Sequence, residues 1–384
     1  MKKKLLFVID SLHSGGAEKS LVSLLSLIDY NNFDVDLLLF KQSGLYLPLI
    51  PKQVNILDTP SYFNNSNKEF KNRVAKIKNS ILIRIPNYKN KYHGAQITAK
   101  NILKALDRQS TKYDVAIAYS QGFPTYYVSD KVEATKKICW INTDYKKAGY
   151  NPKFDRKYYE KYDYMVSVSK KNKEVLEKVY PEFKYKIRVI YDIISTQLVR
   201  EMAENGEGFS DNFEGIRILT IGRHVYLKGY DMAIDAAKIL KDNRVTFRWY
   251  SIGEGTLTDE LKNKIKEYDL EDKFIFLGTF TNPYPFIKEC DIYCQPSRFE
   301  GFGLAIAEAR ILNKPIVVTN FDIVYDQIKD EENGLISEMN GYSVSKNIER
   351  LIEEENLRKK IINNIKMEQV GTEDEINKVL KLLE

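Results

Sequence analysis

Short apolar runs alternate with amphipathic stretches along the chain, and this alternation predicts strands separated by helices. The apolar runs, such as 4–10 (KLLFVID) and 216–222 (IRILTIG), are rich in Ile, Leu and Val. Strands that are apolar on both sides are typical of parallel sheets that helices cover on each face. The pattern therefore predicts an α/β protein with doubly wound parallel sheets.

The predicted elements form two successive series. In the first half we predict strands at 4–10, 35–40, 114–119, 138–141, 164–169 and 187–192. In the second half we predict strands at 216–222, 246–253, 273–278, 291–297 and 315–320. Helical periodicity favours helices at 17–29, 96–109, 170–179, 229–241, 257–268, 283–289 and 304–313.

A polar stretch that contains glycine, 201–215, separates the two series and is the natural boundary between two Rossmann-like domains. We therefore expect an N-terminal domain over 1–200 and a C-terminal domain over 201–370. The closing part of the chain is charged and helical, with a break at Gly371. We expect the helix of 371–384 to pack back toward the N-terminal domain.

Composition limits the class of protein. The chain has 384 residues and 43% apolar residues, enough for ordinary cores. Its three cysteines, Cys139, Cys290 and Cys294, show no CxxC or Cys/His spacing, so we expect neither disulfides nor a zinc site. The first apolar run is too short to cross a bilayer and lacks a small-residue cleavage site, and no later run is longer. We expect a cytoplasmic protein, with peripheral attachment to the inner face of the cell membrane as an option.

Charge is divided unequally between the halves. Residues 1–200 carry 35 Lys and Arg against 19 Asp and Glu, whereas residues 201–384 carry 24 against 34. Such a split is expected if the first half meets an anionic membrane, nucleic acid or acidic substrate, and equally if lysine is simply frequent on solvated faces. Within this half, 68–85 has the pattern of a basic amphipathic helix, which fits either a membrane surface or ordinary packing on a sheet.

A glycine-rich loop joins an apolar run to a helix in the stretch 291–308, DIYCQPSRFEGFGLAIAE. The free N–H groups at the start of a helix attract anionic oxygens. Glu300 in the loop and Glu308 in the helix add carboxylates that accept hydrogen bonds from hydroxyls. Arg223 and Lys228, which follow the strand 216–222, add cations. Ligands of open α/β sheets bind at the carboxyl ends of the strands, and donors for phosphate beside acceptors for hydroxyls suit a sugar nucleotide there.

These residues resemble the retaining glycosyltransferases of family 4, which have the GT-B fold. The most specific match is the E-x7-E motif, formed here by Glu300 and Glu308. Further matches are the GR…KG element at 222–229, the SIGEG turn at 251–255, the FLG run at 276–278, the ENGLI segment at 332–336 and SGGAEK at 14–19. The resemblance covers essentially the whole chain and implies two Rossmann-like domains whose parallel sheets face a cleft.

The resemblance also implies roles for individual residues. The catalytic set is Glu300, near the ring hydroxyls of the sugar, with Lys228 and Arg223, which neutralise the diphosphate. Glu308 is expected to bind the ribose hydroxyls. The full set of residues expected to contact the donor is Gly16, Gly253, Glu254, Thr279, Phe280, Gly301, Phe302, Gly303, Leu304 and Glu308. For Phe280, contact with the base and plain core packing are both open.

The acceptor side departs from the family pattern. Many members have a histidine in the stretch that matches 140–145, where this chain has Asn142. His13, Asn142 and Asp144 are therefore the candidates on the acceptor side, although for His13 the sequence alone favours a loop residue without a role. Many members likewise have asparagine where this chain has Asp192. The stretch 145–164, rich in Tyr and Lys, is a candidate lining for an acceptor groove.

The function implied is transfer of a hexosyl unit, most simply from a UDP-sugar, to a glycan or polyprenyl-diphosphate-linked acceptor in the synthesis of surface polysaccharide or another glycoconjugate. No cofactor and no metal are expected, since cations and helix N–H groups stabilise the leaving diphosphate. Two alternatives remain: a non-catalytic GT-B partner of another transferase, and a nucleotide-sugar epimerase of the same fold. Nucleic-acid binding and NAD chemistry are disfavoured because no matching motif is present.

Overall fold

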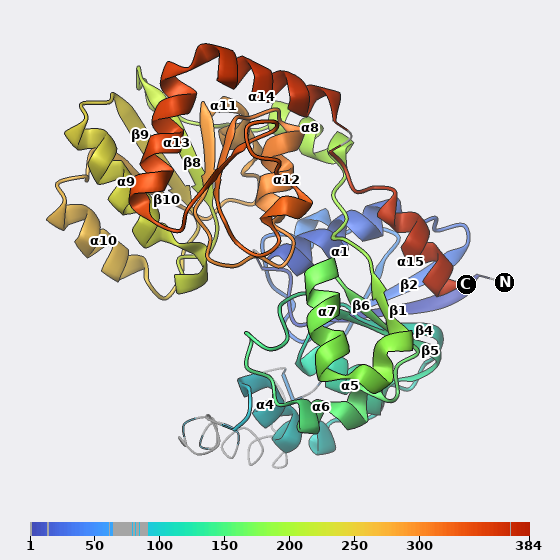
Figure 1. Ribbon diagram of the computed structural model, residues 1–384. Coiled ribbons are helices and arrows are strands. Elements are labelled where there is room, and N and C mark those ends of the chain that lie inside the picture. The colour runs from blue at the N-terminus through green and yellow to red at the C-terminus, as the bar shows by residue number, and fades with distance from the viewer. Residues whose placement is uncertain are drawn as a thin grey trace. The chain divides into compact units, whose positions relative to one another are not determined.

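The computed structural model describes residues 2–13, 15–60, 62–63, 79, 81, 84, 91–368 and 370–384. It consists of two compact units (Figure 1). Unit 1 comprises Met1–Ile193 together with Asp374–Glu384, and unit 2 comprises Ile194–Glu373. The expected boundary at residue 200 lies inside a helix of unit 2, α8 (Thr196–Glu204). The basic segment 68–85 lies largely outside the described residues.

Unit 1 is built on a parallel sheet with the strand order β3-β2-β1-β4-β5-β6-β7. Its described strands are β1 (Lys3–Ile9), β2 (Phe33–Leu39), β3 (Asn55–Leu57), β4 (Lys112–Ala118), β5 (Glu133–Ile141), β6 (Tyr164–Ser167) and β7 (Ile187–Val189). Its described helices are α1 (Gly16–Leu27), α4 (Gly94–Ile102), α5 (Phe123–Lys131), α6 (Pro152–Tyr159), α7 (Lys170–Val179) and α15 (Glu375–Leu383). Short 3₁₀ turns lie at Leu47–Leu49, Leu103–Ala105 and Pro181–Lys186.

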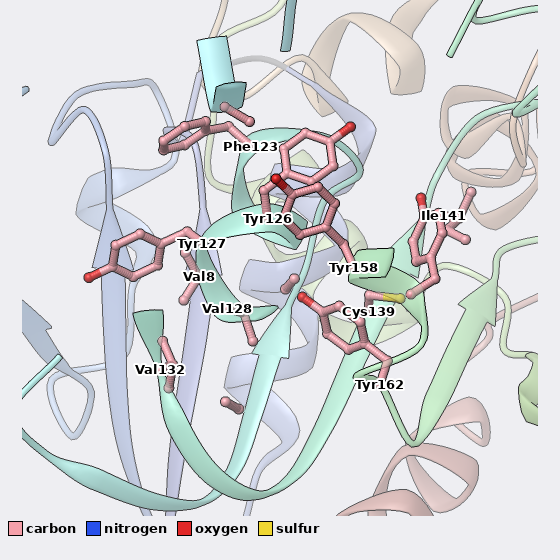
Figure 2. Packing of buried hydrophobic residues seen from close by; sticks show 14 of the residues in the cluster. Val8, Phe123, Tyr126, Tyr127, Val128, Val132, Cys139, Ile141, Tyr158 and Tyr162 are labelled. Atoms are coloured by element: carbon pink, nitrogen blue, oxygen red, sulfur yellow. The ribbon is translucent and has the colours of Figure 1, made fainter. Parts of the chain in front are cut away.

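Helices cover both faces of this sheet, as apolar strands require. Successive residues of β1 belong to different cores: Leu6 and Val8 lie in one, and Leu5, Phe7 and Ile9 lie in the other. Figure 2 shows the first core, in which Tyr126 and Tyr127 of α5 and Tyr158 of α6 lie against β1 and β5. The second core is closed by α1 and by Val379 and Leu383 of α15. Lys3 Nζ also donates to the backbone oxygen of Leu383, so the last helix is part of unit 1.

Unit 2 repeats the same plan with the strand order β10-β9-β8-β11-β12-β13, again in parallel. Its described strands are β8 (Ile216–Ile221), β9 (Phe247–Ile252), β10 (Phe274–Gly278), β11 (Ile292–Gln295), β12 (Ile316–Thr319) and β13 (Leu335–Ser337). Besides α8, its described helices are α9 (Tyr230–Asp242), α10 (Thr258–Glu267), α11 (Tyr284–Glu289), α12 (Leu304–Ile311), α13 (Gly341–Glu353) and α14 (Glu355–Met367). Short 3₁₀ turns lie at Tyr226–Lys228 and Val324–Asp326.

The prediction of two doubly wound parallel sheets is confirmed, but several elements were not predicted. The short edge strands β3 and β13 carry too few residues for a clear alternation. Helix α5 is buried at nearly all of its positions, so it shows no amphipathic period. Helix α8 extends into the polar stretch 201–215, which was expected to be a linker. Its residues Val199 and Ala203 are buried four positions apart, on one face of the helix.

The stretch 145–164 was expected to present aromatic rings to an acceptor, and for four of its tyrosines this is wrong. Tyr145, Tyr158, Tyr159 and Tyr162 are each at most 4% exposed and belong to the first core of unit 1. Two of them donate buried hydrogen bonds: the Tyr145 hydroxyl to Asp155 Oδ2 and the Tyr162 hydroxyl to the Thr125 carbonyl, each at 2.5 Å. Asp155 is itself fully buried and also accepts from Tyr126 and Gln96. These four rings therefore pack the core of unit 1 and are not free to line an acceptor groove.

Candidate active site

The loops that follow β8 and β11 meet at the point where the strand order of unit 2 reverses. These strands are neighbours, with Leu219 opposite Tyr293, although they lie far apart in the sequence. The Leu227 carbonyl accepts hydrogen bonds from the backbone N–H groups of Arg298 at 2.8 Å and Phe299 at 3.3 Å. Such a reversal of strand order leaves a crevice at the carboxyl edge of a sheet, where ligands of this fold bind. The two loops thus form a single tied structure at that position.

An ion pair joins the two loops. Lys228 Nζ lies 2.6 Å from Oε1 and 2.8 Å from Oε2 of Glu300, so the ammonium bridges both carboxylate oxygens. The side chain of Lys228 is 22% exposed and that of Glu300 only 9%. A partly buried pair with this geometry is screened much less than a surface pair. Lys228 is therefore positioned by Glu300, and any anion that binds there must share the ammonium with this carboxylate.

Glu300 is fixed in turn by hydroxyl and amide donors that the sequence analysis did not single out. Ser297 Oγ donates to Glu300 Oε1 at 2.6 Å, and Gln295 Nε2 approaches the same oxygen at 3.3 Å. The Tyr293 hydroxyl donates to Gln295 Oε1 at 2.6 Å and orients that amide. These residues come from β11 and the first turn after it, so the strand itself carries the supports of the carboxylate.

A second ion pair stabilises the turn that carries Lys228. Arg298 donates to both oxygens of Asp231, at 2.7 and 2.5 Å, and to the Tyr226 carbonyl at 3.0 Å. Its guanidinium also lies over the Tyr226 ring, 4.2 Å from the ring centre. Burial alone would raise the pKa of Asp231, but the hydrogen bonds from Arg298 outweigh it and lower that pKa. Arg298 therefore has a positioning role that was not predicted.

Two glycines allow these loops to touch. Gly229 has φ +64°, and a Cβ there would lie 1.9 Å from the Pro296 carbonyl oxygen. Gly253 has φ +141°, and a Cβ there would lie 2.0 Å from the Gly222 carbonyl oxygen. Both positions exclude a side chain. Gly253 was expected to contact the donor, and here the group that approaches it is the protein's own backbone.

A buried histidine, His224, ties the loop after β8 to β9 and α10, and it was missed from the sequence. Its Nδ1 lies 2.9 Å from Thr258 Oγ1 and its Nε2 lies 2.9 Å from Ser251 Oγ. Burial, with a smaller effect of the Lys262 charge, lowers the pKa of His224 to about 4. The ring is therefore neutral at pH 7 and serves as a hydrogen-bonded anchor. Its place directly after Arg223, between a strand and a loop, was the available signal.

Helix α12 begins at the same edge. Its N-cap is Gly303, with φ +87°, and no side chain among the described residues caps it. Gln327 Nε2 donates to the carbonyls of Phe302 and Gly303 and so holds the entry into the helix. The N–H groups of the first turn are therefore available to an anion. Phe302, expected at the donor, is 7% exposed, whereas Gly301 and Leu304 are half-buried.

Glu308, the second carboxylate of the E-x7-E pattern, lies inside the protein. It is fully buried in α12, and its Oε1 accepts a hydrogen bond from the Tyr284 hydroxyl at 3.1 Å. The structure thus separates the two carboxylates by environment, since Glu300 faces a cation and Glu308 faces a phenol. A ribose hydroxyl that reached Glu308 would be recognised in a dry setting, where a hydrogen bond discriminates strongly.

The other residues expected at the donor have different exposures. Arg223, Glu254 and Thr279 are exposed, and the Arg223 side chain makes no hydrogen bond or ion pair with any described residue. Phe280 is 36% exposed and rests against Phe286, with ring centres 4.6 Å apart. It is therefore partly open to a ligand and partly packed. The cavity of about 300 Å³ in unit 2 lies elsewhere, at the amino ends of β8 and β11.

The candidates on the acceptor side lie in unit 1. His13 is exposed, with Nε2 3.3 Å from Ser43 Oγ. Asp144 is 5% exposed, and its Oδ1 accepts from the backbone N–H groups of Lys146 and Lys147, so this carboxylate holds a turn. The amide nitrogen and oxygen of Asn142 are both buried and have no partner among the described residues. Gly16 is exposed at the first position of α1.

An acidic group that was not predicted lies at the reversal of strand order in unit 1, between β1 and β4. Asp10 follows β1, and its Oδ2 accepts from Ser120 Oγ, after β4, at 3.4 Å. Part of Asp10 is open to solvent, yet the surrounding protein and the nearby Glu18 carboxylate raise its pKa to about 6. Asp192 is 6% exposed, and burial followed by the charge of Glu18 raises its pKa to about 7. This edge therefore disfavours further negative charge.

Comparison with known proteins identifies the second unit. Residues 209–368 match the family model described as "Glycosyl transferases group 1". Unit 2 carries a glycosyltransferase domain. The match confirms the prediction of a glycosyltransferase.

Among the relatives of this glycosyltransferase, an N-acetylgalactosamine-N,N'-diacetylbacillosaminyl-diphospho-undecaprenol 4-alpha-N-acetylgalactosaminyltransferase of Campylobacter jejuni is 26% identical over 366 residues, which are 95% of this chain and 94% of the relative. A poly(ribitol-phosphate) alpha-N-acetylglucosaminyltransferase of Staphylococcus aureus is 35% identical over 123 residues, 31% of this chain and 24% of the relative.

Solved structures confirm the GT-B fold over the whole chain. A TarM of S. aureus, in complex with fondaparinux, alpha-GlcNAc-glycerol and UDP, gives a TM-score of 0.70 at 16% identity and covers 99% of both chains. Anabaena HepE with UDP and glucose gives 0.71 at 15% identity, also over 99% of both chains. None of the helices that the structure describes is both long and apolar enough to cross a membrane.

Proposed function

We propose that this glycosyltransferase is a retaining enzyme of the family 4 type, in which Glu300 and Glu308 form the E-x7-E motif. It transfers a hexosyl unit from a UDP-sugar to a glycan or lipid-linked oligosaccharide during the synthesis of surface polysaccharide or another glycoconjugate. The observation that carries the proposal is the contact between Lys228 and Glu300 beside the start of α12, at the reversal of strand order in unit 2. The UDP present in the TarM and HepE complexes supports the choice of nucleotide.

The chemistry needs positive charge on the leaving group. When the bond between the anomeric carbon and the diphosphate oxygen breaks, the nucleoside diphosphate gains negative charge. Lys228, Arg223 and the first N–H groups of α12 supply preorganised stabilisation, which is stronger in the transition state than in the ground state. We propose that these groups suffice without a metal.

Glu300 has two tasks in this proposal. It positions the Lys228 ammonium, as their distances of 2.6 and 2.8 Å show, and it offers lone pairs to the ring hydroxyls of the sugar. Because Ser297 and Gln295 also hold this carboxylate, its position changes little when a donor arrives. Glu308 is assigned to the ribose hydroxyls, and Phe280 to the nucleotide base through its exposed face.

The acceptor is assigned to unit 1 for an electrostatic reason. Asp10, Glu18 and Asp192 repel a diphosphate at the carboxyl edge of that sheet, whereas neutral hydroxyls of a glycan are suitable partners there. The buried amide of Asn142 adds a donor and an acceptor at the same edge. The relative from C. jejuni is named for a diphospho-undecaprenol substrate, which supports a lipid-linked acceptor.

The test combines binding with turnover. UDP-, GDP- and ADP-sugars are compared by the rise in unfolding temperature, because a ligand that binds only the folded state stabilises it. We expect the largest rise with a UDP-sugar, and release of UDP that continues in EDTA. Loss of turnover in EDTA with recovery in Mg²⁺ or Mn²⁺ would contradict the metal-independent route.

Two further outcomes distinguish the alternatives. Release of UDP together with a changed free sugar, without transfer to any acceptor, indicates an epimerase. Absence of nucleotide binding indicates a non-catalytic partner of another transferase. The anomeric configuration of the product, read by NMR, decides between retention and inversion.

A further inference from the structure

A basic groove lies in unit 1, apart from the residues of the candidate active site. Its volume is about 580 Å³, and it runs between the C-terminal halves of α4, α5 and α6. The described residues that line this basic groove are Ala99, Lys100, Leu103, Lys104, Arg108, Asp130, Lys131, Phe154, Lys157, Tyr158 and Lys161.

The charge of the basic groove is strongly one-sided. Among the described lining residues are six cations and one carboxylate, an excess of five positive charges. Asp130 is already engaged by Lys161 at 2.6 Å. The ends of three helices add a partial negative charge of about −0.5 each, which leaves a clear positive balance. The cavity at the amino edge of unit 2 is lined by Asp291, Lys314 and Arg358, an excess of only one.

Two further observations describe the field and the surface. Burial, and then the charges of Lys161 and Arg108, lower the pKa of Lys137, as expected beside a concentration of cations. Lys157 Nζ lies 4.8 Å from the ring centre of Tyr158, which is 4% exposed, and 5.5 Å from that of Phe154, which is half-buried, so the cations and not the rings form the exposed surface here.

The position of the basic groove separates it from the transfer reaction. Arg108, Lys131 and Lys161 come shortly before β4, β5 and β6, three adjacent strands, and so lie at the amino edge of the sheet. Asn142 and Asp10 follow their strands and lie at the opposite, carboxyl edge, where ligands of this fold bind. These cations therefore do not take part in chemistry at the carboxyl edge.

We propose that the basic groove is a docking surface for the phosphate groups of an anionic lipid bilayer. The proposal deepens the membrane part of the proposed function and does not depend on the donor chemistry. Helix ends at the groove present carbonyls and not N–H groups, so a single free phosphate lacks the converging backbone donors of a built anion site. A surface with many phosphates needs only the summed attraction of several cations, and the groove supplies it.

The test measures binding of the full chain to phosphatidylcholine vesicles with and without phosphatidylglycerol. The variant combines Lys104→Gln, Arg108→Gln and Lys157→Gln, which are exposed positions. The matched control combines Lys170→Gln, Lys171→Gln and Lys178→Gln, which are exposed on α7 and lose the same charge outside the groove. We expect the groove variant to bind anionic vesicles roughly 100-fold more weakly and the control to stay within a few-fold of wild type.

Additional measurements keep the result interpretable. Lys104→Arg with Lys157→Arg retains the charge, and it should bind like wild type if the groove acts through charge. Trp140 fluorescence verifies that unit 1 is folded, and UDP affinity should be unchanged in every variant. Failure of UDP binding in wild type contradicts the proposed function and leaves the vesicle result standing.

Three outcomes would overturn the proposal. The first is equal weakening by the groove and control sets, which means that net charge alone drives binding. The second is binding that does not depend on phosphatidylglycerol. The third is saturable binding of inorganic pyrophosphate by wild type that the groove variant loses, measured at an ionic strength matched with chloride. That result would identify the groove as a site for free phosphate.

Discussion

The two units share one strand order around their centres and yet carry opposite chemistry where that order reverses. In unit 2 the loops after β8 and β11 bring together Lys228 and Glu300 beside an uncapped helix start in the described structure. In unit 1 the loops after β1 and β4 bring together Asp10 and Ser120, with Glu18 close by. The fold supplies the same crevice twice, and the sign of the side chains decides which crevice suits a diphosphate.

The net charge of each half of the chain is opposite in sign to the charge of its crevice. Residues 1–200 carry an excess of 16 positive charges (35 against 19), but their crevice is acidic. Residues 201–384 carry an excess of 10 negative charges (24 against 34), but their crevice holds the cations. An excess of five positive charges in unit 1 lies instead at the opposite edge of its sheet, in the basic groove. The positions of individual charged side chains, and not the net charge of a half, therefore decide the charge of each crevice.

The largest effect that we expect concerns Asp192 in unit 1. Its pKa is raised from 3.8 to about 7, so the folded protein keeps a proton that the unfolded chain loses above pH 4. The free energy of unfolding therefore falls as pH rises from 4 to 7, by at most about 4 kcal/mol. Asp192→Asn removes this fall. Its stability relative to wild type should increase across that range, measured by denaturant unfolding.

Each unit contains one of the two tryptophans, Trp140 or Trp249, and both are buried. Fluorescence of Trp140 in a Trp249→Phe background therefore reports on unit 1 alone. Asp10, with a pKa of about 6, gives a smaller fall of the same sign that remains in the variant. A stability difference that does not vary with pH would show that Asp192 ionises normally in the folded state.

His224 should give unit 2 the opposite response. Its pKa is lowered from 6.5 to about 4, so below pH 6.5 the unfolded chain takes up a proton that the folded ring refuses. Unit 2 should lose up to about 3 kcal/mol of stability as pH falls from 6.5 to 4, as read from Trp249 in a Trp140→Phe background. His224→Gln should abolish the acid loss, whereas His93→Gln, in unit 1, should leave it unchanged. If unit 2 weakens on acidification equally with and without His224, other groups are responsible.

The contrast between the units also shows what a sequence reveals. The apolar runs predicted both sheets, because a strand buried on two faces leaves a clear signature. The residues Lys228, Glu300 and Gly303 were found because they follow strands in the order that a crevice needs. The positioning residues Ser297, Arg298 and His224 were not found. Their significance depends on partners up to 72 positions away, as for Arg298 and the Tyr226 carbonyl, and no local pattern encodes such a pairing.

The basic segment and the tyrosine-rich stretch show a different limit. Frequent lysine and tyrosine carry little information about placement, because each serves both solvent and core. Tyr159 and Tyr162 are buried beside residues that are charged and exposed, such as Lys157 and Lys161. Only packing reveals that the rings face the sheet and the ammonium groups face the groove.

Lys228→Ala should remove leaving-group stabilisation from the crevice of unit 2. We expect kcat to fall by about 100-fold or more, because the ammonium acts on charge that develops in the transition state. Lys228→Arg, which keeps the charge beside Glu300, should recover part of the loss. Arg223→Gln should have a smaller effect, since its side chain is exposed. A pure rise in KM after Lys228→Ala would contradict the role.

The smallest expected effect tests whether Glu308 belongs to the site or only to the core. Glu308→Gln keeps the shape and leaves a carbonyl oxygen for the Tyr284 hydroxyl, which now lies 3.1 Å from Oε1. If the carboxylate accepts hydrogen bonds from the ribose, the affinity for UDP should fall by roughly 10-fold while kcat changes little, because these contacts are alike in ground and transition states. Tyr284→Phe provides the control, since it removes the phenol and leaves the carboxylate in place. Trp249 unfolding measures how far either change disturbs the core of unit 2. Weaker UDP binding by Glu308→Gln with unchanged unfolding places the carboxylate at the ligand. Equal losses of stability in both variants, with UDP affinity intact, would show that Glu308 is only a buried partner of Tyr284. Glu300 would then be the carboxylate that acts on the ligand in the crevice of unit 2.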